Sequence, residues 1–249
     1  MPGTPRDLDD YVRQYRDLPF EGLQLGHRRR HVLARIAAHR PTGVLEVGCG
    51  DAPLFPDLPG LRCAVVEPAA SFAEGARRLA EGNPAVAVLE RPIEDVAPGE
   101  LGEPFDVVVL SGVLHEVTDP QAVLTAIAGL LAPAGVLHVN VPNAGSLHRR
   151  LAVAMGLIPD LGTTSQIQRA MQQRGIYDRT TLDEELVRAG FGVVARGGIL
   201  VKPFTHAQMQ HLVDDGFLTD PMLDGLDRLA EELPELASEI WADARRAAA

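Results

Sequence analysis

The chain has 249 residues, of which 46% are hydrophobic and 23% charged. This composition is typical of a globular protein and excludes wholesale disorder. The formal net charge of −11 argues against nucleic acid as a partner, because binding to a phosphate backbone requires a concentrated basic surface. The one dense basic stretch, residues 28–30, is interpreted as a solvated helix face.

No targeting or membrane-spanning segment is recognised in the sequence. The first ten residues are polar and acidic and lack the apolar stretch of a signal peptide. The most apolar segment, residues 122–141, contains Pro133 and Gly135 and is better interpreted as a helix, a turn and a strand than as a membrane span. Cys49 and Cys63 form no C-x-x-C pair and indicate neither disulfides nor a metal site. A cytoplasmic protein with no membrane partner and no bound metal is therefore expected.

Helix-like and strand-like segments alternate along most of the chain. A helix is predicted at residues 28–39, and Pro41 and Gly43 break its pattern. Further along, the pattern predicts strands at 44–47, 63–66, 86–89, 105–110 and 136–141 and helices at 70–81 and 121–131. Strands joined by crossover helices form a parallel sheet that is covered on both faces, so a doubly wound α/β fold is expected.

The second half of the chain adds an insertion, two strands and a helical tail. Residues 143–179 have helical stretches and no strand pattern, and a helix is predicted at 182–189. The segments 192–195 and 198–202 are close enough to pair as an antiparallel hairpin at the sheet edge, which brings the sheet to seven strands. After Pro203 the chain is predicted to be helical to its end, with one apolar face formed by Met222, Leu226, Leu229, Ala230 and Leu233.

These elements divide the chain into three parts. Residues 1–40 are expected to form a helical lid, residues 41–204 the α/β domain with its insertion, and residues 205–249 a helical extension. The apolar face of the extension is interpreted as docking on the core, with a homodimer interface as the alternative. Near the N-terminus, Tyr11 and Tyr15 lie one helical turn apart, and simple packing is favoured there over a role in closing the site.

The most informative stretch is a glycine turn that directly follows the strand at 44–47. Gly48 and Gly50 permit backbone angles that other residues avoid, and they let a ligand lie against bare main chain. Glu67 ends the second strand, 19 residues after Gly48, where its carboxylate can accept both ribose hydroxyls of an adenosine. This combination predicts a cofactor that contains adenosine.

Two residues beside the turn separate the candidate cofactors. Pro53 stands where a dinucleotide-binding turn favours a third glycine, which allows the helix to approach the pyrophosphate. Glu46 places a negative charge that repels a pyrophosphate but attracts a cationic ligand. A sulfonium cofactor with an ammonium group therefore fits better than NAD. An NAD-dependent oxidoreductase and a non-catalytic binding module are kept as alternatives.

Several segments resemble the motifs of class I S-adenosylmethionine-dependent methyltransferases, in the same order along the chain. They are residues 45–50, 66–68, 105–117, 139–143 and 186–194. The resemblance implies a Rossmann-like fold and S-adenosylmethionine as cofactor, with S-adenosylhomocysteine as product. It also implies that Gly48 and Gly50 contact the methionine part, that Glu67 binds the ribose and that Ser111 lines the methionine side.

One position departs from the family pattern. Many members have an acidic residue after the third strand that accepts a hydrogen bond from the adenine amino group, and here Pro92 occupies that position. Glu94, Asp95 or the backbone around Ile93 is expected to take over this role.

Candidates for the chemistry follow the fourth and fifth strands, because the reacting centre of an open α/β sheet lies beyond the carboxyl ends of its strands. His115 and Glu116 are candidates for a general base or a substrate contact, with packing beneath the cofactor as the alternative for His115. His148 faces the same cleft or is a surface histidine. Tyr177 is placed to close over the substrate, whereas Asp178 beside it is interpreted as a helix N-cap.

The remaining histidines are given structural roles. His138 is interpreted as a core or sheet-face residue, and His206 and His211 as surface groups, because their spacing matches no metal site. The negative charge and the size of the expected cap favour methyl transfer to an oxygen or nitrogen of a small biosynthetic or tailoring substrate.

Overall fold

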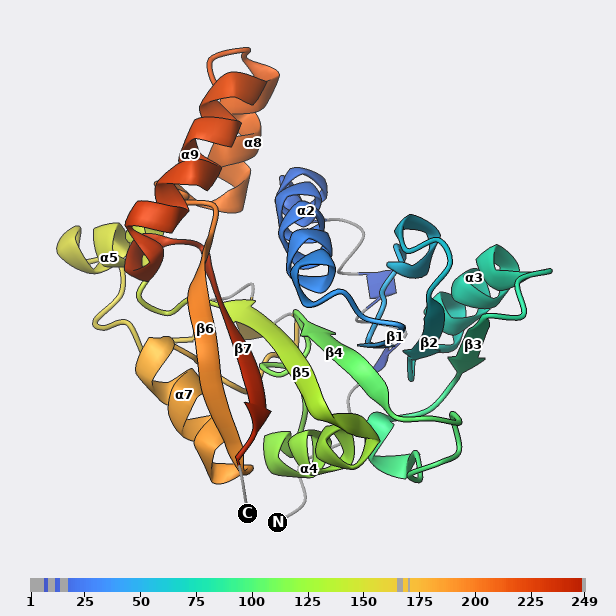
Figure 1. Cartoon of the computed structure of the whole chain (residues 1–249). Helices are drawn as coiled ribbons and strands as arrows, with labels where there is room; N and C mark the ends of the chain where they lie inside the picture. The colour runs from blue at the N-terminus through green and yellow to red at the C-terminus, as the bar shows by residue number, and fades with distance from the viewer. Residues whose placement is uncertain (1–6, 9–11, 14–17, 165–167, 170, 248–249) are drawn as a thin grey trace.

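The computed structural model describes residues 7–8, 12–13, 18–164, 168–169 and 171–247. Their centre is one seven-stranded sheet in the order β3-β2-β1-β4-β5-β7-β6 (Figure 1). The strands are β1 (Gly43–Val47), β2 (Arg62–Val66), β3 (Val86–Leu89), β4 (Phe105–Ser111), β5 (Leu131–Pro142), β6 (Phe191–Ile199) and β7 (Glu239–Arg246). Only β7 runs antiparallel to its neighbours, which confirms the predicted seven-stranded, mostly parallel Rossmann-like sheet.

Helices cover both faces of the sheet (Figure 1). One face carries α2 (Glu21–His39) and α3 (Ala70–Ala80), and the other carries α4 (Pro120–Leu130) and α7 (Arg179–Arg188). Successive side chains of a strand point to opposite faces, so Val44 packs in the cluster with α2 and α3 while Leu45 packs in the cluster with α4 and α7. Burial on both sides explains why these strands are continuous apolar runs.

Two helix starts follow from the sequence. The Asp119 carboxylate accepts the Ala122 N–H at the start of α4, and Pro120 occupies the first helical turn. Asp178 forms a capping box with Thr181 at the start of α7, so the predicted N-cap role of Asp178 is confirmed. The insertion contributes α5 (Leu147–Ala154), and three short 3-10 helices lie at Phe55–Asp57 (η1), Ile93–Asp95 (η2) and Pro234–Leu236 (η3).

The predicted hairpin and the predicted all-helical C-terminus were wrong. Residues 191–199 form the single strand β6, and its antiparallel partner β7 comes from the last residues of the chain. Gly197 and Gly198 lie inside β6, at positions where other residues approach the backbone closely. A Cβ on Gly197 would lie 2.7 Å from Trp241 Nε1 on β7.

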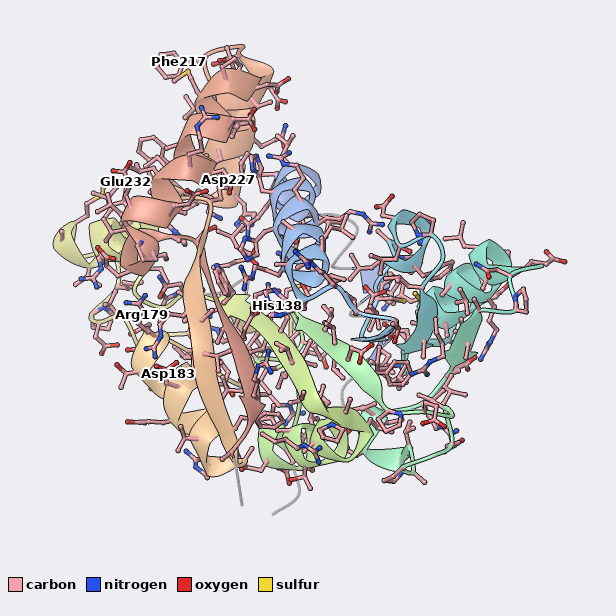
Figure 2. All side chains as sticks on the ribbon, in the orientation of Figure 1. His138, Arg179, Asp183, Phe217, Asp227 and Glu232 are labelled. Carbon is pink, nitrogen blue, oxygen red and sulfur yellow. The ribbon has the colours of Figure 1, made fainter. Side chains whose placement is uncertain are left out.

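Between these strands, α8 (His206–Asp214) and α9 (Asp220–Glu232) form a pair of helices that projects from the end of the sheet, with Phe217 at its tip (Figures 1 and 2). Leu223 and Ala230 of α9 are buried, and Leu226 packs beside them, so the apolar face docks on the chain's own core as predicted. Met222 is 44% exposed and does not belong to the buried face. The homodimer alternative stays a prediction, and Tyr11 and Tyr15 lie outside the described residues.

The prediction that residues 28–30 form a solvated face was wrong for two of the three arginines. Arg28 is bound by Glu239 of β7 and by Glu21, and Arg29 is bound by Asp57. Only Arg30 is exposed. The helix lies across the sheet, and its arginines therefore meet acidic residues that are distant in the sequence. In the part of the chain that is described, no helix is long and apolar enough to cross a membrane.

Candidate active site

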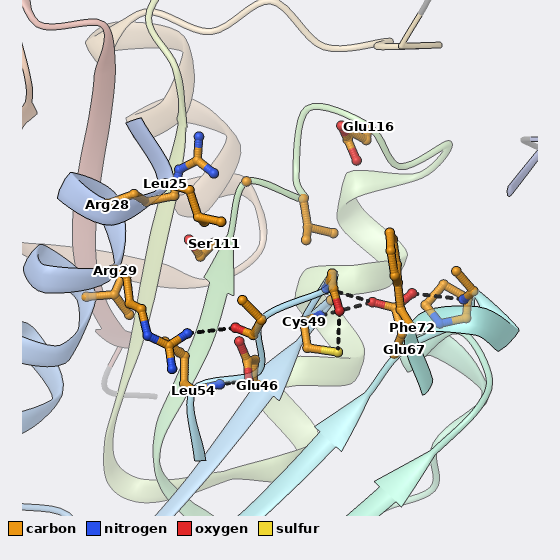
Figure 3. Close-up of a pocket in the computed structure, with 18 of the residues that line it drawn as sticks. Leu25, Arg28, Arg29, Glu46, Cys49, Leu54, Glu67, Phe72, Ser111 and Glu116 are labelled. Atoms are coloured by element: carbon orange, nitrogen blue, oxygen red, sulfur yellow. Dashed lines mark hydrogen bonds between the residues drawn. The ribbon is translucent and has the colours of Figure 1, made fainter. Parts of the chain in front are cut away.

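A cavity of about 120 Å³ lies at the carboxyl ends of β1, β2 and β4 (Figure 3). Five of the predicted cofactor residues line it, namely Glu46, Gly48, Gly50, Glu67 and Ser111. The other two do not: the Ile93 side chain is buried in the core cluster beneath α4, and Glu94 is exposed. The expected contacts to the adenine amino group therefore stay a prediction.

The turn after β1 requires glycine. Gly48 and Gly50 have φ values of 76° and 55°, in the left-handed region that side chains disfavour. A Cβ on Gly48 would also lie 2.5 Å from Val113 Cγ2. The bare main chain of the turn thus forms one wall of the cavity.

The Glu67 carboxylate fastens this turn to the end of β2. Its Oε2 accepts the N–H groups of Cys49 at 3.0 Å and Gly50 at 3.3 Å, and its Oε1 accepts the Ala69 N–H at 2.8 Å (Figure 3). The sequence indicated Glu67 as a ligand for a ribose, but not as the residue that shapes the turn.

Glu46 is a second buried acid of the same cavity. Burial raises its pKa to about 8. The hydrogen bond that its Oε2 accepts from the Leu54 N–H at 2.8 Å lowers the pKa but does not offset the effect of burial. Arg29 lowers this pKa and the charge of Glu67 raises it. Arg29 also donates to the carbonyl oxygen of Ala52 at 2.7 Å (Figure 3) and to that of Pro53 at 2.9 Å, so it holds the segment that follows the glycine turn.

These residues fit a cationic adenosine cofactor. Two buried carboxyl groups and a bare glycine turn line one cavity. Burial destabilises the ionised form of a carboxyl group, and the charge of a positive ligand stabilises that form. Ionised carboxylates at these positions would repel the negative charge of a pyrophosphate.

A second cavity of about 400 Å³ adjoins the first. The four residues predicted for the chemistry, His115, His148, Glu116 and Tyr177, all line it. The two cavities share Arg28, Gly112 and Glu116 in their walls. The residues predicted for the cofactor and for the chemistry thus line two cavities with a shared wall, although the elements that supply them are far apart along the chain.

His115 and Glu116 lie where this second cavity meets the first. Both are buried, and His115 Nε2 lies 3.6 Å from Glu116 Oε1. The His115 carbonyl oxygen accepts the N–H groups of Arg174 at 2.8 Å and Gly175 at 2.9 Å. These bonds attach the end of the insertion to the loop after β4, which positions Tyr177 nearby in the chain.

His148 and Tyr177 are uncharged at neutral pH. Burial, with contributions from Lys202, His206 and Arg149, lowers the pKa of His148 to about 3. Burial raises the pKa of Tyr177 to about 12. At pH 7 both groups can therefore form hydrogen bonds, and His148 is a weak base.

Sequence reasoning missed several polar residues of the larger cavity. Lys202 is only 1% exposed and lies at the end of an apolar run, a pattern that would have singled it out. The surface position predicted for His206 was wrong, because this residue lines the cavity with ring nitrogen Nδ1 2.9 Å from Lys202 Nζ. The prediction for His211 is confirmed, since its side chain is exposed. His138 is fully buried and bonds to Asp243, as its core role required (Figure 2).

Comparison with known proteins gives matches along most of the chain. The family model described as a methyltransferase domain matches residues 22–196. The ubiquinone biosynthesis O-methyltransferase of Xanthomonas axonopodis pv. citri (strain 306) is 32% identical over 131 residues, which are 51% of this chain and 53% of that protein. The chain thus spans about half the length of this curated relative.

Two solved structures share the fold. The 1,6-didemethyltoxoflavin-N1-methyltransferase of Burkholderia thailandensis, with S-adenosylhomocysteine bound, has a TM-score of 0.59 at 18% identity, and the match covers 97% of this chain and 87% of that one. The N-methyltransferase NodS of Bradyrhizobium japonicum WM9, also with S-adenosylhomocysteine, has a TM-score of 0.54 at 16% identity, with coverages of 92% and 89%.

The comparisons and the cavity agree on methyl transfer rather than on the NAD-dependent alternative. S-adenosylhomocysteine, which is bound in both similar structures, contains an adenosine and no pyrophosphate, in agreement with the two buried acids of the cavity. Because the family model matches well over half of its residues, the chain belongs to the family described as a methyltransferase domain.

Proposed function

We propose that this methyltransferase methylates an oxygen or nitrogen atom of a small molecule that binds in the cavity of about 400 Å³. The observation that carries the proposal is the shared wall of Arg28, Gly112 and Glu116, which joins this cavity to the one at the glycine turn. A volume of this size lies within the range of roughly 300–1,000 Å³ that is common for small-molecule sites.

Under this proposal, the cofactor's methionine part lies against Gly48 and Gly50, near Ser111, and its ribose meets Glu67. The cofactor's positive charge stabilises the ionised form of the Glu46 carboxyl group. The adenine amino group lies near Ile93 and Glu94. S-adenosylmethionine supplies an electrophilic methyl group on a positively charged sulfur. The protein's part is to orient the acceptor in line with that methyl group and to exclude water.

His115 is proposed to accept the proton of a hydroxyl acceptor, oriented by Glu116. It lines the larger cavity directly beside the wall that the two cavities share. The pKa of about 3 makes His148 too weak a base for this role, and Tyr177 with a pKa of about 12 stays protonated. An amine that binds in its neutral form would need only positioning.

The proposed lid and cap consist of residues 1–40, the insertion at 143–179 and the extension at 205–249. Residues from α2, α5 and the start of α8 line the larger cavity, which supports this arrangement. The similar proteins carry the names of an O-methyltransferase and of an N1-methyltransferase solved with a small heterocyclic compound, in agreement with a small biosynthetic or tailoring acceptor.

The test combines cofactor binding with a survey of acceptors. Calorimetry should show S-adenosylhomocysteine binding, and mass spectrometry should show the mass gain of one methyl group on members of a panel of phenols, hydroxy acids, amines and heterocycles. The variant His115→Gln should lower kcat for a hydroxyl acceptor by roughly 10²–10⁴-fold. Its affinity for S-adenosylhomocysteine should stay within twofold of wild type.

Turnover with protein or nucleic acid, and with no small molecule of the panel, would overturn the proposal. Unchanged kcat in His115→Gln would remove His115 from the mechanism and leave the acceptor class intact.

A further inference from the structure

The larger cavity contains a buried lysine that has no acidic partner. Lys202 Nζ lies 3.2 Å from Gln24 Oε1 and 2.9 Å from His206 Nδ1, and among the described residues no carboxylate lies within 4 Å of it. An ammonium has three N–H donors, and buried lysines are normally paired with an acid. Lys202 therefore forms no direct ion pair at this wall, although Glu21 and Glu239 act on its charge from a longer distance.

A second cation of the same cavity, Arg149, is likewise without an ion pair in the described part of the chain. Its side chain is buried, and its terminal nitrogens donate to the carbonyl oxygens of Leu161 and Thr163 and to Gln168 Oε1. These neutral acceptors hold the guanidinium in place without neutralising it. Its Nε has no hydrogen-bond partner among the described residues.

Neutral polar atoms surround the two cations. His148 precedes Arg149 on α5, lines the same cavity, and has no described partner for its Nδ1. Buried polar atoms are normally hydrogen-bonded, and those without a protein partner commonly meet a ligand or water. Lys202, Arg149 and His148 line the larger cavity only, whereas Gly112 and Glu116 belong to both.

The acids of this cavity are already bound by other groups. Glu239 accepts from Arg28 at 2.7 Å, from Gln24 at 2.6 Å and from Asn140 at 2.8 Å. Glu21 is held by Arg28 at 3.1 Å, and burial, which would raise its pKa, is outweighed by Arg28 and His206, so that its pKa falls to about 2. Both acids contact Arg28, Glu21 also lies 3.5 Å from His206 Nε2, and neither forms an ion pair with Lys202.

We propose that the acceptor carries an oxyanion, and that Lys202 and Arg149 bind it while His148 donates a hydrogen bond. This inference rests on the proposed function, because it assigns the larger cavity to the acceptor. The chemistry favours a carboxylate or a phosphoryl group on the acceptor, at a distance from the atom that is methylated beside Glu116. The anion would thereby fix the orientation of the acceptor toward the cofactor.

The ionisation of Lys202 supplies a signature of such binding. Burial lowers its pKa to about 8, and the nearby charges of Glu21 and Glu239 raise it while Arg28 lowers it. His206 and His148 also lie in this neighbourhood, from α8 and α5. A bound anion raises the pKa of Lys202, so binding at pH 8 should take up as much as about half a proton.

The test uses the wild-type protein saturated with S-adenosylhomocysteine and three small probes: benzoate, its neutral analogue benzamide, and phenylphosphonate. Benzoate or phenylphosphonate should bind at least tenfold more tightly than benzamide, and whichever binds better identifies the anion. Calorimetry in two buffers of different ionisation enthalpy should detect the proton uptake without any substitution.

Lys202→Met and Arg149→Met should each weaken binding of the anionic probe at least tenfold and leave benzamide binding within twofold. The proton uptake should disappear in Lys202→Met. Arg150→Met, at the exposed neighbouring position, is the matched control and should behave as wild type.

Equal affinity for benzoate, phenylphosphonate and benzamide, or an absence of proton uptake in the wild type, would overturn the inference. The proposed function is tested separately by methyl transfer. Turnover of neutral acceptors with no anion preference would leave methyl transfer intact and refute the oxyanion site. Anion binding without methylation of any small molecule would support the oxyanion site and refute the proposed methyl transfer to a small molecule.

Discussion

Replacement of Glu46 by glutamine tests the electrostatics of the cofactor cavity. Glu46 Oε2 accepts the Leu54 N–H at 2.8 Å, and the carbonyl oxygen of a glutamine can accept the same hydrogen bond. The substitution therefore keeps the shape of the site and removes only the ionisable group. Burial raises the pKa of this group from 4.5 to about 8.

The raised pKa makes the wild-type protein less stable as the pH rises. The folded carboxyl group keeps its proton up to about pH 8, whereas the unfolded group loses it near pH 4.5, so the unfolded state binds fewer protons between these values. The stability that this group contributes is thus fully present below pH 4.5 and is lost progressively up to pH 8. Between pH 5.5 and pH 8 the loss amounts to about 3 kcal/mol.

Urea unfolding of the cofactor-free protein and of Glu46→Gln at pH 5.5 and pH 8 measures this difference. Other titrating groups act on both proteins alike, so the stability of the variant relative to wild type should increase by about 3 kcal/mol across this range. A change of less than about 1 kcal/mol would refute the reasoning, because it would mean that the folded carboxyl group ionises near its ordinary pKa.

Three further predictions concern other groups. Gly48→Ala should weaken S-adenosylhomocysteine binding at least tenfold in calorimetry and lower the free energy of unfolding by about 1–3 kcal/mol, because its φ is positive and Val113 occupies the space of a Cβ; wild-type affinity would contradict this. Burial would raise the pKa of Asp243, but hydrogen bonds from His138, Arg35 and His39 hold it well below its usual value. Asp243→Asn should therefore lower the free energy of unfolding, measured in urea at pH 7, by about 3–5 kcal/mol. The difference in stability between wild type and variant should narrow as the pH falls below about 4, and a difference that stays constant would be inconsistent with this. Burial raises the pKa of both cysteine thiols, that of Cys63 to about 11, so the native protein should react with a thiol reagent at pH 8 at least tenfold more slowly than the urea-unfolded chain, and equal rates would rule this explanation out.

The cofactor half of the site could be predicted from the sequence because its determinants are local. Gly48 and Gly50 follow β1 directly, and Glu67 ends the next strand, so their neighbours along the chain already specify their place at the carboxyl edge of the sheet. The same reasoning located His115 at the end of β4 and the cap of α7 at Asp178. The roles of these residues toward a ligand stay predictions, but their positions follow from short-range patterns.

Strand β7 could not be predicted because its pattern is interrupted by charges that only the folded chain neutralises. Asp243 is fully buried and accepts from Arg35, His39 and His138. An acid at such a position argues against a central strand unless its cationic partners are known, and two of these lie more than 200 residues away, on α2. The strand therefore looked like part of a polar helical tail.

The same long-range pairing explains why the acceptor side of the site was harder to predict than the cofactor side. Arg28 of α2 lines both cavities and meets Glu239 of β7, which lines the larger one. Because Arg28 binds both Glu21 and Glu239, the hydrogen-bonding partners of Lys202 among the described residues are Gln24 and His206. The misassigned basic stretch, the unrecognised strand and the missed lysine are thus consequences of one arrangement of charges. A sequence pattern records each of these residues separately, whereas a buried lysine without an ion pair in the larger cavity is recognised only once α2 and β7 have been brought together.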